Sequence, residues 1–190
     1  QDSINDNADV ALFSGDKLIG GPQCGIIVGK SKYIKQILAN PLMRAMRVDK
    51  MTLAALQATL TLYRNPETAM QQVPILRMLS MPIENLKLRS EKIAAQIEHL
   101  SCIAKCETVA GNSMLGGGSL PTQKLPTWCL CIEPATGSVD ALADKLRRSE
   151  PAVMGRVHQD RLLLDLRTIQ VGEDADVVAA FESIAIPATD

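Results

Sequence analysis

A lysine in a glycine-rich turn is the residue of this sequence that most clearly invites chemistry. Lys17 follows an apolar strand candidate, residues 10–13, and precedes the pair Gly20 and Gly21. Open α/β sheets bind ligands at the carboxyl ends of their strands, and an amine held there can form a Schiff base with a carbonyl cofactor. On spacing alone, an ordinary surface lysine in a turn is the better interpretation.

Two arginines further along the chain are spaced for anion binding. Arg44 and Arg47 are three residues apart, so on a helix they would share a face. The planar guanidinium donates paired hydrogen bonds to phosphate-like oxygens. Taken by itself, an Arg-x-x-Arg pair is normally a solvated basic face.

Composition limits the classes of function. The 190 residues carry a net charge of −1, which excludes a strongly basic nucleic-acid-binding domain, although residues 30–50 hold six basic side chains. The amino terminus shows no signal-peptide pattern, and no apolar stretch approaches the roughly 20 residues that span a bilayer. We therefore expect a cytoplasmic protein without a membrane segment.

The cysteines and histidines suggest no metal site. The five cysteines are an odd number, and neither Cys102 with Cys106 nor Cys129 with Cys131 has zinc-ribbon spacing. We expect buried reduced thiols, with Cys129 and Cys131 on one face of a strand; a metal site is the minor alternative. The two histidines receive no role.

The apolar pattern predicts two parts. Residues 1–75 supply two strands (10–13 and 25–28), a short helix that Ser31 caps and a longer one that Asp49 caps. These elements are too few to cover a doubly wound sheet. Residues 76–190 predict a small α+β unit, in which a loop from Gly111 to Pro126 is expected to be a flexible connection. Its expected helices span 83–100, 139–148 and 174–184, and its expected strands span 103–109, 127–133, 152–158 and 162–166, the last two joined as a hairpin.

The run Ser14-Gly-Asp-Lys-Leu-Ile-Gly-Gly-Pro-Gln-Cys-Gly25 resembles the cofactor-lysine motif of the bacterial selenocysteine synthase family, the L-seryl-tRNA(Sec) selenium transferases. The segment from Pro41 to Leu56 resembles the family's paired-arginine segment. Gly116–Pro121, Gly155–Val157 and Arg161–Arg167 fit its carboxyl-terminal domain and mainly support the alignment. The resemblance covers nearly the whole chain, and the lysine and arginine motifs are its specific part.

The resemblance implies a fold, a cofactor and roles. The fold is α/β: the tail of a fold type I large domain of pyridoxal-phosphate (PLP)-dependent enzymes, residues 1–75, followed by a small α+β carboxyl-terminal domain, residues 76–190. Lys17 would bind pyridoxal 5′-phosphate and act as a base, and Ser14 would contact its phosphate unless it only caps the turn. Asp16 would assist proton transfer or serve as a turn residue. Arg44 and Arg47 would grip selenophosphate or the seryl adduct.

The implied reaction converts seryl-tRNA(Sec) to selenocysteyl-tRNA(Sec) with selenophosphate, a β-replacement through an aminoacrylyl intermediate, in a homo-oligomer with active sites at subunit interfaces. Enzymes of this fold also use an aspartate and a stacking ring upstream of the lysine, and neither lies in these residues. The isolated chain is therefore expected to be inactive or a weak PLP binder. Two alternatives stay open: a related PLP-dependent lyase or eliminase acting on a small or phosphorylated amino acid, and an inactive fragment that only assembles.

Overall fold

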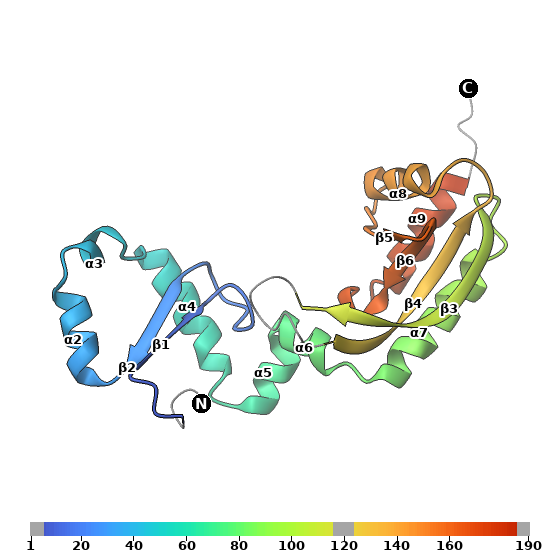
Figure 1. Ribbon diagram of the computed structural model, residues 1–190. Coiled ribbons are helices and arrows are strands. Elements are labelled where there is room, and N and C mark those ends of the chain that lie inside the picture. The colour runs from blue at the N-terminus through green and yellow to red at the C-terminus, as the bar shows by residue number, and fades with distance from the viewer. Residues whose placement is uncertain (1–5, 116–123, 186–190) are drawn as a thin grey trace. The chain divides into compact units, whose positions relative to one another are not determined.

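The computed structural model describes residues 6–115 and 124–185 (Figure 1). They form two compact units, which divide between Ser80 and Met81. None of the described helices is long and apolar enough to cross a membrane. The sequence-based boundary at residue 75 falls close to this division, and its assignment to a large and a small domain stays a prediction.

The amino-terminal unit is a two-stranded antiparallel sheet followed by helices. Strand β1 pairs with β2 in the register Val10↔Gly29 to Ser14↔Gly25. The elements are β1 (Val10–Ser14), β2 (Gly25–Gly29), α2 (Ser31–Ala39), α3 (Leu42–Ala45), α4 (Lys50–Leu62), α5 (Pro66–Gln72) and α6 (Pro74–Ser80).

Side-chain caps explain where two of these helices begin. The Asp49 carboxylate accepts a hydrogen bond from the Thr52 amide at the start of α4, as predicted. The Asn65 side chain likewise caps α5, with Pro66 in the first turn, so the Asn-Pro pair begins a helix that the sequence analysis missed. The expected cap by Ser31 was wrong, because Lys30 occupies the N-cap of α2 without a side-chain bond.

The carboxyl-terminal unit is a four-stranded antiparallel sheet packed against helices. The strand order is β3-β4-β6-β5. The elements are α7 (Ile83–Ile97), β3 (Ile103–Met114), β4 (Lys124–Pro134), α8 (Val139–Arg148), β5 (Arg156–His158), β6 (Arg161–Asp165), the 3₁₀ turn η1 (Leu166–Thr168) and α9 (Asp174–Ala185).

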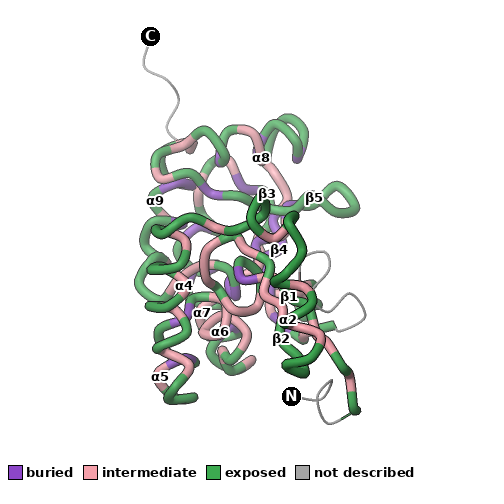
Figure 2. Tube along the Cα trace, turned by 90° about the vertical axis from the view of Figure 1, so that its left-hand side faces the viewer, coloured by how far each residue is buried: buried purple, intermediate pink, exposed green. Residues whose placement is uncertain are grey.

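The core of this unit lies between one sheet face and helices α7, α8 and α9, where buried segments gather in Figure 2. Alternate residues of β4 and β6 enter it, including Leu130, Ile132 and Leu162, as period-two patterning requires. The helix expected over 174–184 is confirmed as α9, and its Val177 and Phe181 side chains are buried.

Several predicted boundaries in this unit were wrong. The helix expected to reach Leu100 ends at Ile97. The expected loop from Gly111 to Pro126 is largely strand at both ends, because Gly111 pairs with Thr127 and Met114 with Lys124. The strand expected from Ala152 begins only at Arg156. Upstream of it the Val153 amide donates to Leu146 O at the end of α8 instead of to the sheet.

The hairpin between β5 and β6 is confirmed. Gln159 and Asp160 join the strands with φ of 51° and 57°, the left-handed conformations that two-residue hairpin turns require.

Candidate functional site

Backbone hydrogen bonds fix the turn that carries Lys17. It begins where β1 ends, and the Gly15 amide donates to Cys24 O at 2.9 Å, while the Gly21 amide donates back to Gly15 O at 2.8 Å. Between them, the Gly20 amide donates to Lys17 O at 2.9 Å. The lysine backbone is therefore held in a closed loop at the carboxyl end of a strand. We call residues 15–21 the Lys17 turn.

Two glycines of the motif are required by close packing. A Cβ atom at Gly15 would lie 2.5 Å from Cys24 Sγ and 2.8 Å from Pro22 O. Gly20 has a φ of +67°, and a Cβ there would lie 2.7 Å from Cγ1 of the buried Val73. A larger residue at Gly15 would displace its neighbours, and one at Gly20 would in addition strain the backbone.

Three of the predicted site residues line one hollow beside the Lys17 turn. Ser14, Asp16 and Lys17 share a depression of about 630 Å³, together with Gln23 and Cys24. The size falls within the roughly 300–1,000 Å³ of small-molecule sites. We call it the Lys17 hollow. Lys17 and Asp16 are exposed and Ser14 is half-buried.

Ser14 and Asp16 interact with each other. The Ser14 hydroxyl donates a hydrogen bond to the Asp16 carboxylate. This bond, followed by a backbone hydrogen bond and the nearby Lys17 charge, holds the pKa of Asp16 below its ordinary value. Asp16 is therefore an ionised acceptor at neutral pH, next in sequence to the lysine.

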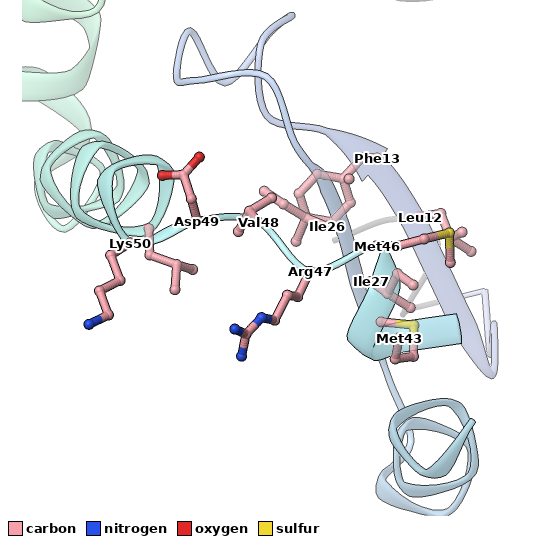
Figure 3. A pocket seen from close by; sticks show the side chains of 12 residues that line it. Leu12, Phe13, Ile26, Ile27, Met43, Met46, Arg47, Val48, Asp49 and Lys50 are labelled. Atoms are coloured by element: carbon pink, nitrogen blue, oxygen red, sulfur yellow. The ribbon is translucent and has the colours of Figure 1, made fainter. Parts of the chain in front are cut away.

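A second hollow of about 800 Å³ adjoins the first and contains Arg47. Figure 3 shows Arg47 extending from the segment that joins α3 to α4, with apolar side chains of β1 and β2 beside it. The two hollows have wall residues in common, namely Leu12, Phe13, Gly25, Met46 and Val48. The structure thus brings the predicted lysine and one predicted arginine to neighbouring parts of one surface.

The expectation that Arg44 and Arg47 share a helix face was wrong. Helix α3 contains only Leu42–Ala45, so Arg44 is in its last turn and Arg47 lies beyond its C-cap, Met46. The chain is extended again at Asp49, which caps α4. Arg44 lines neither of the two hollows. Both arginines are exposed.

The later motifs of the sequence serve the packing of the carboxyl-terminal unit. Arg167 is buried and donates to Pro126 O at 2.6 Å and to Met81 O at 3.3 Å. Asp165 accepts from the Thr127 hydroxyl at 2.7 Å and from the Arg167 amide at 3.1 Å. The Gly116–Pro121 segment lies outside the described residues.

The prediction of buried thiols is confirmed for Cys129 and Cys131, whereas Cys24, Cys102 and Cys106 are half-buried. All five thiols are free, and Cys129 and Cys131 are buried. Burial raises the pKa of Cys106 to about 12 and that of Cys129 to about 11, so both are neutral and unreactive at neutral pH. Among the described residues no group of three or more His, Cys, Asp or Glu side chains could hold a metal ion.

One residue beside the Lys17 turn escaped the sequence analysis as a site residue. Tyr63 is the C-cap of α4, and its hydroxyl lies 2.9 Å from Ile19 O and 3.2 Å from Leu18 O, so one proton is shared between the two carbonyls. No local pattern signals this contact, because Ile19 and Leu18 lie 44 and 45 residues before Tyr63 in the sequence.

The architecture matches a solved structure. The chain aligns with D-glucosaminate-6-phosphate ammonia-lyase at a TM-score of 0.61, with 21% identity, over 96% of this chain and 45% of that one. At this identity the likeness shows the fold alone. The expected α/β fold class is confirmed.

Sequence comparison then defines the family. The family model of L-seryl-tRNA selenium transferase (SelA) matches residues 1–170, and the chain belongs to this family. The L-seryl-tRNA(Sec) selenium transferase of Moorella thermoacetica is 45% identical over 181 residues, covering 95% of this chain and 38% of its own length. The corresponding protein of Hyphomonas neptunium is 41% identical over 185 residues, covering 97% and 40%. The chain thus spans about two fifths of the length of these relatives.

Proposed function

We propose that this chain carries the cofactor lysine of an L-seryl-tRNA(Sec) selenium transferase, which converts seryl-tRNA(Sec) to selenocysteyl-tRNA(Sec) with selenophosphate as donor. One observation carries the proposal: Lys17, Ser14 and Asp16 line a single hollow, and Arg47 lines the hollow that adjoins it. Family membership supports the same assignment.

The residues of the Lys17 hollow fit pyridoxal 5′-phosphate. They supply an amine for the cofactor aldehyde at Lys17 Nζ, a hydroxyl for its phosphate at Ser14, and a hollow of suitable volume. When bound, this cofactor accepts the electron pair that is released at the Cα atom of an amino acid. The Ser14 hydroxyl has one proton, so donating it to a phosphate would require breaking the hydrogen bond to Asp16.

Within this proposal each residue has a defined task. Lys17 Nζ would hold the cofactor and would be the base for the Cα proton of the seryl group. Asp16, ionised and beside Lys17 in sequence, would assist proton transfer. Arg47, and Arg44 one short segment upstream, attract the anionic selenium donor.

The remaining elements of the proposal concern the assembled enzyme. Lys17 is exposed in this chain, whereas a site for this chemistry must exclude water. We therefore propose a homo-oligomer in which residues of a neighbouring subunit complete the site. A cytoplasmic location belongs to the same proposal, because its substrate is an aminoacyl-tRNA.

The attachment test uses the protein that carries this chain. After incubation with pyridoxal phosphate and reduction with borohydride, peptide mass spectrometry should locate the cofactor on Lys17. The Lys17→Ala protein should lose both this label and the absorbance of lysine-bound cofactor, whereas Lys35→Ala, which removes an exposed lysine of α2, should keep both. A label that persists in Lys17→Ala would refute the assignment.

The reaction test separates the alternatives. Selenophosphate-dependent formation of selenocysteyl-tRNA, weakened in Arg44→Ala and Arg47→Ala, supports the transferase. Release of ammonia from a small or phosphorylated amino acid, without that product, would instead support a lyase. An oligomer that binds no pyridoxal phosphate would support a role in assembly only.

A further inference from the structure

Tyr63 ties the Lys17 turn to helix α4. Its hydroxyl lies 2.9 Å from Ile19 O and 3.2 Å from Leu18 O, the two carbonyls that follow Lys17. The side chain is half-buried, and burial raises the pKa of the phenol, so the hydroxyl keeps its proton and acts as the donor.

The two carbonyls need a donor from outside the turn. Leu18 and Ile19 are its central residues, and the turn is closed by the Gly20 amide donating to Lys17 O. The closing bond of this four-residue turn uses the carbonyl of Lys17, so it leaves the carbonyls of Leu18 and Ile19 available to the Tyr63 hydroxyl. Because Leu18 and Ile19 are half-buried, losing the Tyr63 hydroxyl would remove the donor from partly desolvated carbonyls.

Helix α4 also contacts the turn one helical turn earlier. Thr59 lies four residues before Tyr63, so the two share a helix face. A Cβ atom at Gly21 would lie 3.4 Å from Thr59 Oγ1, an ordinary van der Waals distance, so the turn lies against this face of α4. The Thr59 hydroxyl itself donates to Ala55 O, so its contact with the turn is one of packing. Of these two α4 side chains, Tyr63 is thus the one that hydrogen-bonds to the turn.

We propose that Tyr63 is a positioning residue for Lys17: its hydroxyl bonds to the carbonyls of Leu18 and Ile19 fix the turn that directs the lysine amine into the Lys17 hollow. The role of the amine rests on the function proposed above. The effect of Tyr63 on the conformation of the turn does not rest on that function, and it can be measured in the cofactor-free protein.

The test compares the only two tyrosines of the chain. Tyr63→Phe removes the hydroxyl and keeps the ring, and Tyr33→Phe, on α2, is the matched control. In the cofactor-free protein, amide exchange at Gly20 and Gly21 should accelerate about two- to tenfold in Tyr63→Phe. It should be unchanged in Tyr33→Phe. Acceleration that is absent, or that extends equally to peptides of α7, would overturn the proposal.

A second readout addresses the amine. The rate of borohydride-trapped labelling by pyridoxal phosphate should fall about two- to tenfold at Lys17 in Tyr63→Phe, and not at Lys35 of the same molecules. Equal labelling of Lys17 in Tyr63→Phe and Tyr33→Phe would refute the positioning role while leaving the proposed function intact. Labelling that survives in Lys17→Ala would instead refute the proposed function, with the amide-exchange result still standing.

Discussion

Replacing Arg89 with alanine should destabilise the carboxyl-terminal unit strongly. This α7 arginine is only 14% exposed and pairs with Asp174 at the start of α9, with Nη2 2.5 Å from Oδ1 and Nε 3.1 Å from both carboxylate oxygens. The same guanidinium donates to Leu166 O at 3.2 Å and Ile169 O at 3.0 Å. One side chain therefore joins α7, η1 and the beginning of α9.

The size of the effect follows from what the truncation leaves behind. Breaking a buried ion pair from one side costs about 3–5 kcal/mol, because a charge stays without its partner. Asp174 is 35% exposed, so water partly replaces the lost pair and the lower end of that range applies. We expect Arg89→Ala to lower the free energy of unfolding by about 3 kcal/mol. With a denaturant slope of about 2 kcal/mol per molar urea, the unfolding midpoint falls by about 1.5 M.

The assay is urea unfolding followed by tryptophan fluorescence. Trp128, the only tryptophan, lies in β4 and reports on the carboxyl-terminal unit. Arg147→Ala is the control, because Arg147 forms an exposed pair with Asp144 within α8 and should cost about 0.5 kcal/mol or less. A midpoint for Arg89→Ala within about 0.3 M of the control would refute the reasoning.

Two further predictions concern titrating groups. Ser14→Ala should raise the pKa of Asp16 towards its ordinary value, because it removes the largest cause of the lowering; a carboxyl titration by NMR that shows no rise would contradict the assigned hydrogen bond. Cys106 and Cys129 should react with iodoacetamide at pH 8 only after unfolding, because pKa values of about 12 and 11 leave almost no thiolate. In the unfolded chain these thiols lose their protons at a lower pH than in the folded protein. The free energy of unfolding should therefore fall as pH rises from about 9 towards 11. Peptide mass spectrometry and urea melts across that range would check both.

Apolar periodicity and capping residues predicted the carboxyl-terminal unit well, because each of its long helices packs one apolar face against the hydrophobic core. Ser138 caps α8, whose bounds match the expected range, and the hairpin turn at Gln159 and Asp160 was located correctly. The errors lie where long-range pairing decides the conformation. Gly111 and Pro126 look like loop residues in sequence, yet β3 and β4 continue through them because each strand offers the other a backbone partner.

The candidate site was predictable only in its local part. The Ser14–Lys17 run and its glycines are contiguous, so their motif indicated the turn and its lysine directly. The geometry of Arg47 was not predictable from spacing, because α3 ends at Ala45, so Arg47 lies outside the helix that contains Arg44. Tyr63 reaches the turn across more than 40 residues, and a single sequence carries no signal for such a contact.

The two units also differ in how they hold their residues, and this difference bears on the site. In the described part of the amino-terminal unit the buried apolar side chains are Ala69 and Val73, and α4 has no buried residue although it is largely apolar. Few buried apolar side chains of the described residues lie in the unit that carries the Lys17 turn. Specific contacts hold the turn within this unit, among them its own three backbone bonds, the approach of Gly20 to Val73, and the Tyr63 hydroxyl. Removing one of few contacts changes a conformation more than removing one of many, so a single hydroxyl on α4 can govern the position of the lysine.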